Sequence, residues 1–499
     1  MITIQPHTSE KIEHDVDKNE LLARLKMFLS KKLILTEIEQ LKPFECDALS
    51  AYHCVPWLVV LPETLEQIQN ILSLCFQLGV PVVARGAGTG LAGGAIPLDN
   101  GVLISLAKFN QVLEVDVENR FARVQPGVRN LAISQAVAQY GLYYAPDPSS
   151  QIACSIGGNV AENSGGVHCL KYGLTTHNIL RLKILTMEGE LVTIGSHGLD
   201  SPGYDLLALL TGSEGMLGII VEITVKLLPL PEAAQVILAA FDSVEKAGSA
   251  VAEIIASGLI PAGLEMMDKA TIKAAEDFIH AGYPLNVEAI LLCELDGTAE
   301  QVEEELIQAS DIFLLQGAVD VKVARSEQER LKMWAGRKAA FPAVGRISPD
   351  YYCMDGTIPR RHLAKVLKQI SQLSEHYGLA VANVFHAGDG NLHPLILYNA
   401  NNEGELEKAE LFGGDILKLS VEVGGTITGE HGVGVEKINY MCFQFSAGEL
   451  LLFHALKAAF DSKGLLNPGK AVPTLHRCAE FGAMHVHGGV LPFPELDRF

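Results

Sequence analysis

Two histidines lie close together in the stretch VANVFHAGDGNLHPLIL, residues 381–397. Asp389-Gly390 is a favoured two-residue hairpin turn, and an apolar run flanks it on each side. Pairing about that turn places His386 directly opposite His393, with Cβ atoms predicted to lie roughly 5 Å apart on one face. Two imidazoles at this spacing suit a divalent metal ion, so the stretch predicts a metal site.

A third ligand is expected from GGTITGEHGVG, residues 424–434, where Glu430-His431 stands between glycines. Neighbouring side chains in an extended segment diverge, so one of the pair can bind metal while the other points elsewhere. The residues alone do not show that this segment meets the histidine hairpin, and structural histidines remain the alternative. Ordinary surface or packing roles are favoured for three more histidines near the C-terminus, His476, His485 and His487.

A glycine-rich loop follows a strand-like run in VARGAGTGLAGGAIP, residues 83–97, with five glycines between residues 86 and 94. Such density indicates tight turns or backbone amides laid against an anion, helped here by Arg85 and the Thr89 hydroxyl. The loop also matches the dinucleotide pattern G-x-G-x-x-G, which requires a helix directly after the glycines. Gly94, Pro97 and Gly101 leave no room for that helix, so an NAD site is disfavoured.

A second stretch of small residues, APDPSSQIACSIGGNVAENSGG (145–166), repeats this theme. Its paired glycines and the amides of Asn159 and Asn163 suit a flat polar ligand approached by backbone. The alternative is a long irregular loop, although long loops in compact domains are usually functional.

Apolar periodicity predicts a helix over 63–78 capped by Gly79, and then strands on both sides of the glycine loop. GSEGMLGIIVEITVKLLP (212–229) is typical of a glycine turn followed by a strand. Beyond residue 232, AQVILAAF, AGLEMMD, EAILLCEL and AVDVKVA read as strands separated by helix-like segments. This alternation predicts an α+β domain on a ferredoxin-like theme, followed by a helical region over about 402–475.

The composition limits the function classes. The chain has 499 residues, enough for two or three domains, and a formal net charge of −21 that argues against a nucleic-acid surface or an anionic-membrane surface. No secretion signal or membrane-spanning run is recognisable, which favours a cytoplasmic location. The nine cysteines include no C-x-x-C pair, which excludes an iron–sulfur site built by closely spaced cysteines of this chain.

Five motifs occur in an order that resembles one family of flavoproteins: RGAGTGLAGG, APDPSSQIACSIGGNVAENSGG, ISPDYYCMDGTIP, FHAGDGNLHP and GEHGVG. The order is that of the FAD-binding D subunits of bacterial glycolate oxidases. These are vanillyl-alcohol-oxidase type flavoproteins, related to D-lactate and D-2-hydroxyglutarate dehydrogenases. The resemblance runs from about residue 45 to the C-terminus, and the ordered set is far more specific than the glycine loop alone.

The resemblance implies an α+β fold in which a vanillyl-alcohol-oxidase type FAD-binding domain with two subdomains carries a ferredoxin-like cap. The expected divisions are 1–52, an N-terminal helical segment; 53–232, the FAD-binding domain; 233–400, the cap; 401–475, a helical segment returning to the flavin; and 476–499, a tail.

The resemblance also assigns roles to residues. FAD contacts are implied for Arg85, Gly86, Ala87, Gly88, Thr89, Gly90, Leu91, Gly93, Gly94, Pro148, Ser155, Gly157, Gly158, Asn159, Asn163, Tyr172, Gly173 and Ile220. His386, His393 and Glu430 match the ligands of a divalent metal, zinc or manganese-like. His431 is expected to be the base, Arg337 of Trp334 to Arg337 the clamp for the substrate carboxylate, and Asn391 a further catalytic residue. The glycine loop contains no histidine, so FAD is expected to be non-covalent.

The implied reaction is oxidation of a small 2-hydroxy acid, glycolate or possibly D-lactate, with hydride passing to flavin N5. Where hydroxyglutarate enzymes carry further polar contacts, this chain has Tyr351, Tyr352 and Cys353, which favours substrates without a second carboxylate. The expected partners are a second FAD-binding-like subunit and an iron–sulfur subunit, with peripheral membrane association through them. The alternatives are a stand-alone D-2-hydroxy-acid dehydrogenase and a zinc-dependent hydrolase.

Overall fold

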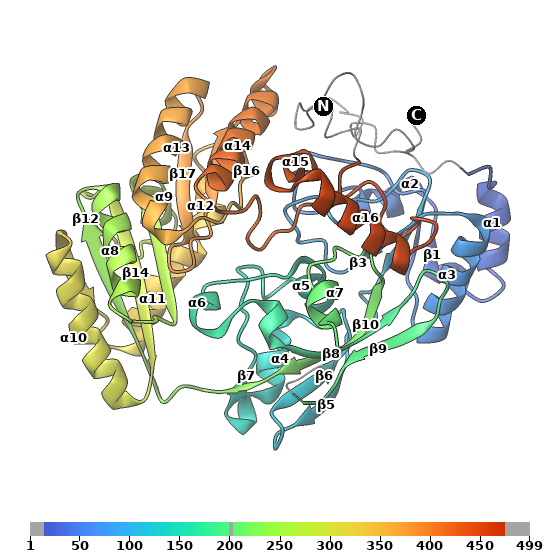
Figure 1. Cartoon of the computed structure of the whole chain (residues 1–499), viewed down its shortest axis with the longest axis horizontal. Helices are drawn as coiled ribbons and strands as arrows, with labels where there is room; N and C mark the ends of the chain where they lie inside the picture. Colours follow the sequence, from blue (N-terminus) through green and yellow to red (C-terminus); the bar gives the residue numbers. More distant parts are fainter. Residues whose placement is uncertain (1–13, 199–202, 475–499) are drawn as a thin grey trace.

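The computed structural model describes residues 14–198 and 203–474, so the predicted tail 476–499 and its three histidines lie outside the described residues. Figure 1 shows two halves side by side. The elements drawn from blue to green form one half, and those from yellow-green to orange form the other. The last helices, in red, lie back against the first half.

A four-stranded sheet carries the glycine loop, in the order β1-β2-β4-β3. Its strands are β1 (Ile34–Leu35), β2 (Leu58–Val60), β3 (Val82–Arg85) and β4 (Val102–Ser105). The last three are parallel, and β1 pairs antiparallel with β2, so the N-terminal segment predicted as helical also supplies a strand. That segment contains the helices α1 (Lys18–Leu25) and α2 (Ile38–Leu41).

Helix α3 (Leu65–Leu78) packs on this sheet and ends at Gly79 as the sequence predicts, although it begins two residues later than predicted. Thr64 caps its N-terminus, and Gly79 ends it in the left-handed region with φ 70°. Between β3 and β4 the described chain forms no helix, which confirms that the glycine loop is not a Rossmann turn.

A second, antiparallel sheet completes the first half, in the order β5-β6-β10-β8-β9. Its strands are β5 (Val112–Asp116), β6 (Phe121–Val124), β8 (Ile179–Leu185), β9 (Leu191–Gly195) and β10 (Ile219–Lys226). Smaller elements around it are α4 (Asn130–Val137), β7 (Leu142–Tyr143), α6 (Cys169–Tyr172), α7 (Leu206–Leu210) and β11 (Leu228–Pro229). The stretch 145–166 is not wholly irregular, because it contains helix α5 (Ile156–Glu162), which Ser155 caps.

The other half is built on a seven-stranded sheet, in the order β15-β12-β14-β13-β17-β18-β16. Its strands are β12 (Ala233–Phe241), β13 (Gly263–Asp268), β14 (Ala289–Gly297), β15 (Ala318–Val323), β16 (Asp350–Cys353), β17 (Val381–His386) and β18 (Pro394–Tyr398). The first four have the antiparallel fourth-first-third-second arrangement of a ferredoxin-like unit, as predicted. Three strands extend that unit beyond β13.

Helices cover both faces of this sheet. Successive residues of β12 therefore alternate between two cores, with Ile237 and Ala239 facing one and Val236 and Leu238 facing the other. The first core contains α8 (Val244–Ala256), α10 (Ala299–Leu315), α13 (Leu363–Tyr377) and α14 (Glu405–Glu422). The second contains α9 (Lys269–Ile279), α11 (Glu327–Lys338) and α12 (Ala340–Val344).

The C-terminal segment ties the second half back to the glycine loop. After α15 (Met441–Gln444) and α16 (Ala447–Phe460), Leu466 forms a parallel bridge with Val82 of β3. The Asn467 side chain donates to the carbonyls of Gly94, at 3.0 Å, and Glu214, at 2.7 Å. The end of the described chain therefore holds the loop that precedes β4.

We expect Asn467→Gly to lower the free energy of unfolding by about 2 kcal/mol, because the buried Glu214 carbonyl loses its side-chain donor and the Gly94 carbonyl keeps only Lys470. Asn467 has φ 45°, which glycine tolerates, so the change isolates the side chain. Exposed Arg120, with φ 54°, is the matched control, and Arg120→Gly should leave the stability nearly unchanged. Urea unfolding measures both variants, and equal stabilities would contradict the anchoring role.

Candidate active site

The two glycine-rich stretches, some 60 residues apart in sequence, meet in space. A side chain at Gly86 would overlap the Ser155 Oγ that caps α5, so this loop packs directly on the helix N-terminus. Within residues 14–198 and 203–474, the backbone N–H groups of residues 86–90 have no hydrogen-bond acceptor. Unpaired amides of a glycine loop beside a helix N-terminus form a cradle for an anion such as a diphosphate.

The polar side chains predicted to touch the cofactor are bonded within the protein. Arg85 donates to the carbonyls of Phe44, at 3.3 Å, and Ala95, at 3.4 Å, and so braces the loop. The amide oxygen of Asn159 accepts from Asn130 at 3.0 Å, and that of Asn163 accepts from the Thr176 amide at 2.9 Å. The cradle therefore offers mainly backbone N–H groups to a bound anion.

Other predicted contacts surround the same region. Tyr172 donates its hydroxyl to Asp296 of the cap at 2.6 Å, and Gly173 turns with φ 80°. Ile220 is buried in β10. The remaining predicted contacts lie in the two glycine-rich stretches, and their individual roles toward FAD stay predictions.

The histidine hairpin has a different register from the predicted one. The strands pair Ala382 with Leu395, and an isolated bridge joins His386 to Asn391. The prediction that His386 lies directly opposite His393 was wrong, because four residues close the turn instead of two. The amide of Gly390, with φ 84°, donates to the His386 carbonyl at 3.1 Å. The two histidines are diagonal neighbours, which still leaves their ring centroids 5.1 Å apart.

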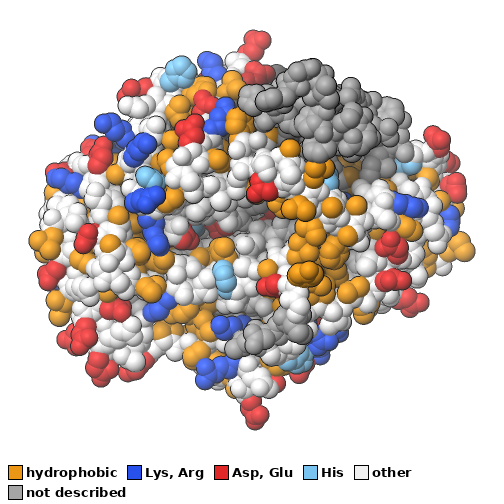
Figure 2. All heavy atoms as spheres, in the orientation of Figure 1, with side chains coloured by type: hydrophobic (Ala, Val, Ile, Leu, Met, Phe, Trp, Pro, Cys, Tyr) orange, Lys and Arg blue, Asp and Glu red, His pale blue; other side chains and the backbone are white. Residues whose placement is uncertain are grey.

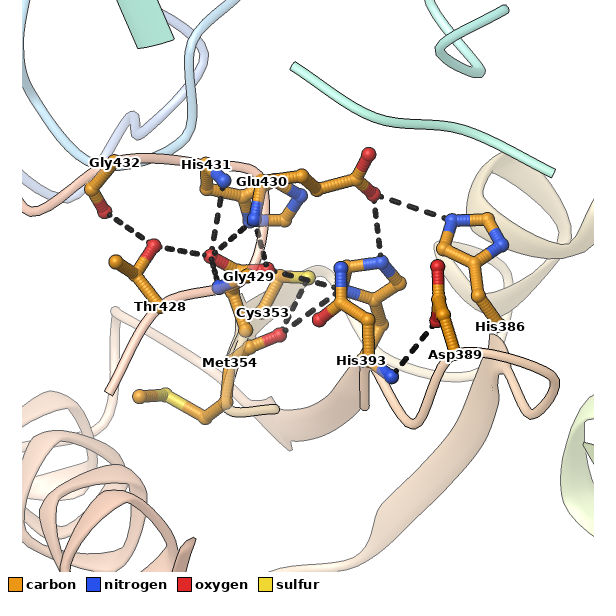
Figure 3. Close-up of polar contacts among 12 residues, drawn as sticks. Cys353, Met354, His386, Asp389, His393, Thr428, Gly429, Glu430, His431 and Gly432 are labelled. Atoms are coloured by element: carbon orange, nitrogen blue, oxygen red, sulfur yellow. Dashed lines mark hydrogen bonds and ion pairs between the residues drawn. The ribbon is translucent and has the colours of Figure 1, made fainter. Parts of the chain in front are cut away.

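Glu430 reaches this hairpin and completes a cluster of three ligand groups (Figure 3). Its Oε1 lies 2.9 Å from His393 Nε2 and 3.2 Å from His386 Nε2. The three ligand atoms lie within 4.8 Å of one another, and both histidines are almost fully buried. The segments that the sequence could not connect therefore converge.

The outer nitrogens of the two histidines face acceptors. His386 Nδ1 lies 2.7 Å from Glu265 Oε1, and His393 Nδ1 lies 3.3 Å from the Met354 carbonyl. A proton on each Nδ1 leaves an Nε2 lone pair facing the Glu430 carboxylate, an arrangement that requires a positive charge between them. Although burial acts in the opposite direction, Glu265 and Glu430 raise the pKa of His386 well above its usual range, so a positive charge at Nε2, carried by a proton or by a metal ion, is favoured. This donor set fits a divalent cation.

His431 stands beside the cluster. Its ring stacks on that of His393, with centroids 4.8 Å apart and an interplanar angle of 11°. Its Nδ1 is buried without a partner among the described residues. Burial lowers the pKa of His431 to about 4, against the opposing charge of Asp355. The imidazole is therefore neutral near pH 7 and can accept a proton.

Arg337 and Asn391 flank the same cluster. Arg337 lies on α11 and is 2% exposed, and its Nε donates to Glu265 Oε2 at 2.7 Å. Glu265 thus joins Arg337 to His386. The Oδ1 of Asn391 is buried and has no partner among the described residues. The resemblance implied both residues, the structure brings them beside the cluster, and their catalytic roles stay predictions.

Comparison with known proteins identifies the family. Residues 56–195 match the FAD binding domain model, and residues 230–471 match the model for FAD linked oxidases, C-terminal domain. The chain is 66% identical to "Glycolate oxidase subunit GlcD" of Escherichia coli K12 over 485 residues, covering 97% of each chain. It belongs to the FAD-linked oxidases that include these subunits.

Other relatives agree. The chain is 40% identical to "Glycolate oxidase subunit GlcD" of Bacillus subtilis, covering 86% of this chain and 91% of the relative. It is 33% identical to "D-lactate dehydrogenase" of Anaerostipes hadrus, with 90% and 97% covered. The solved structure of p-cresol methylhydroxylase superposes with a TM-score of 0.78 at 17% identity, covering 93% and 98%. The fold is therefore of the vanillyl-alcohol-oxidase type, as predicted, whereas the predicted domain boundaries stay predictions.

Membership of the FAD-linked oxidases means that the chain binds FAD, and the amide cradle described above suits its diphosphate. It also favours flavin chemistry over the zinc-dependent hydrolase considered from the sequence.

Two residues of the site were missed by sequence reasoning. Asp355 is fully buried and accepts hydrogen bonds from the amides of Gly429, Glu430 and His431, and so fixes the loop that carries the glutamate and the base. Glu265 positions His386. Asp355 stands in the MDG of a motif used for the resemblance, but neither residue shows a spacing that points to its partner.

We expect Gly88→Val to give protein with little bound FAD. Gly88 has φ 70°, and a Cβ there would overlap the Arg85 guanidinium, so the cradle must distort. Gly79 has the same φ and open space around its Cβ position, which makes Gly79→Val a matched control for backbone strain. The absorbance ratio of flavin to protein measures occupancy. Stoichiometric FAD in Gly88→Val would show that the loop is not the cradle.

Proposed function

We propose that the chain is the catalytic subunit of a glycolate oxidase type complex, oxidising glycolate to glyoxylate or D-lactate to pyruvate. The observation that carries this proposal is the unpartnered His431 imidazole stacked against a buried three-donor cluster. The substrate class is supported by the names of the relatives, glycolate oxidase subunit and D-lactate dehydrogenase.

Oxidation of a 2-hydroxy acid removes the hydroxyl proton and the Cα hydrogen with its electron pair. FAD, when bound, supplies the two-electron acceptor for that hydrogen. The His431 imidazole accepts the hydroxyl proton, because it is neutral near pH 7 and no described residue competes for its Nδ1. Asp355 holds the His431 backbone at 2.9 Å and thereby the direction of the ring.

His386, His393 and Glu430 would hold a zinc or manganese-like ion, whose charge favours loss of the hydroxyl proton. Three protein ligands leave positions for a substrate oxygen, as catalytic sites require. Glu265 keeps the Nδ1 proton of His386 and so directs Nε2 inward.

Arg337 is proposed to bind the substrate carboxylate. Its Nε donates to Glu265 Oε2, and its Nη2 lies 2.7 Å from the same oxygen. The N–H groups on the outer edge of the guanidinium are therefore left to bind the substrate carboxylate. Asn391 lies between the two histidines in sequence, and its Oδ1, which has no partner among the described residues, would help to orient the substrate.

We further propose that electrons leave through partner subunits, one FAD-binding-like and one with an iron–sulfur cluster, and that the bound FAD is non-covalent. The relatives are named as subunits, which supports a complex. Among the described helices, none combines the length and apolarity needed to cross a membrane. Peripheral attachment to the inner face of the cytoplasmic membrane through partners is therefore part of this proposal. A stand-alone D-lactate dehydrogenase is the second candidate, supported by 33% identity to two such enzymes.

His386→Ala should remove the metal and abolish flavin reduction while FAD stays bound, because the cradle lies in the other half. Glu265→Gln keeps the ligands but replaces the negative charge beside His386 Nδ1 and Arg337 with a neutral amide, so we expect metal affinity to fall on the order of 10- to 100-fold. Elemental analysis and a chelator titration measure both variants. Full activity in metal-free protein would contradict the metal role.

His431→Gln should retain FAD and metal but slow flavin reduction on the order of 100-fold or more, because the proton acceptor is lost. Stopped-flow bleaching of the flavin by glycolate or D-lactate measures this step directly. Bleaching at the wild-type rate would eliminate His431 as the base.

Arg337→Lys keeps the positive charge beside Glu265 but loses the planar pair of donors. The apparent Kd of the substrate in the bleaching assay should therefore rise on the order of tenfold, while metal content stays that of the wild type. Unchanged substrate affinity would remove Arg337 from the carboxylate site.

A further inference from the structure

A cleft of about 790 Å³ separates the two halves beside α6. One wall is formed by residues 169–177 of the FAD-binding half. The other wall is formed by α8 and by residues 357–361, which lead into α13. Figure 2 shows the molecule hollowed near the middle of this face.

The inner end of the cleft adjoins the three-donor cluster. Gly429, which lines it, directly precedes Glu430, and Asn391, which also lines it, pairs through its backbone with His386. The Oδ1 of Asn391 and the Oγ1 of Thr357 lie at this end without partners among the described residues. Unpaired polar atoms at the end of a cleft indicate a path for a polar ligand.

The outer part of the cleft is cationic. Arg360 and Arg361 line it and supply the charge, and His177, which also lines it, accepts from the Leu174 amide through Nδ1. Arg360 uses Nη1 to donate to the Gly388 carbonyl at 2.9 Å, whereas the Arg361 side chain is exposed. Among the described lining residues, Asp389 is the single carboxylate, and it accepts from the Asn391 amide at 3.0 Å.

This local charge opposes that of the whole molecule. A chain with a net charge of −21 repels small anions, and the two arginines that line the cleft attract a carboxylate against that background. The FAD-binding half contributes apolar side chains here, such as Leu170 and Leu174, so the field of the arginines is less screened than on an open surface.

We propose that this cleft is the route by which a small carboxylate anion reaches the three-donor cluster, with Arg360 and Arg361 binding the carboxylate on the way. The proposal deepens the proposed function, on which it rests, by assigning the entry path of the 2-hydroxy acid.

The charge is tested by Arg361→Gln in the full-length, FAD-loaded protein. The second-order rate constant for flavin reduction by D-lactate should fall on the order of 3- to 10-fold at low ionic strength and converge with that of the wild type at high salt. The rate constant at saturating substrate should not change. Arg361→Lys should restore the rate, and Arg325→Gln, at an exposed arginine outside the cleft, is the control. A salt dependence equal to that of the wild type would overturn the role of the arginine.

The route is tested by filling the cleft. Ala256→Trp places a large side chain on the α8 wall, whereas Glu253→Trp places one on the same helix outside the lining. Only Ala256→Trp should slow second-order reduction, by at least tenfold, and both should keep FAD. Equal rates in the two variants would show that the substrate enters elsewhere.

Oxalate separates this proposal from the proposed function, because it is a carboxylate anion with no hydroxyl group or Cα hydrogen to lose. Its association rate, followed by the perturbation of the flavin spectrum, should fall in Arg361→Gln and Ala256→Trp even if no 2-hydroxy acid reduces the flavin. Failure of glycolate and D-lactate to bleach the wild type would reject the proposed function alone. Equal oxalate association rates in all variants would reject the cleft alone.

Discussion

The site depends on one electrostatic constraint, which is that three lone-pair donors face one another with their side chains largely buried. His386 and His393 point Nε2 at the same oxygen of Glu430, at 3.2 and 2.9 Å. With their Nδ1 positions held by Glu265 and Met354, these groups repel unless a positive charge lies between them. The surrounding structure supplies the rigidity that keeps them together.

That rigidity comes from contacts between segments far apart in the chain. Asp355, from the segment after β16, gathers three successive amides around Glu430. The C-terminal segment then crosses to the FAD-binding half, where Glu214 accepts from the amides of Val433 and Gly434 at 2.7 Å each. The loop that carries the base is thus fixed to both halves, which holds the cluster in register with the flavin cradle.

Local sequence patterns predicted helices and strands. Contacts between residues far apart in the sequence could not be predicted from such patterns. Helix α3 was predictable from Thr64 and Gly79 because caps act within one turn. The three metal ligands were predicted from residue chemistry and from the family resemblance. The predicted hairpin register was wrong, because four residues, including Gly390 in the left-handed region, form the turn between His386 and Asn391. Glu265 lies 121 residues from His386, and no periodicity encodes such a contact. The packing of Gly86 on Ser155 also joins residues too far apart in the sequence for a local pattern to predict.

We propose that the cluster of His386, His393 and Glu430 holds a cation. The most direct measurement is anomalous scattering from crystals of the FAD-loaded protein, collected on both sides of the absorption edge of the metal found in solution. The account predicts one anomalous peak within about 2.0–2.3 Å of His386 Nε2, His393 Nε2 and a Glu430 oxygen. No anomalous density there, with the three side chains in the arrangement described, would contradict it.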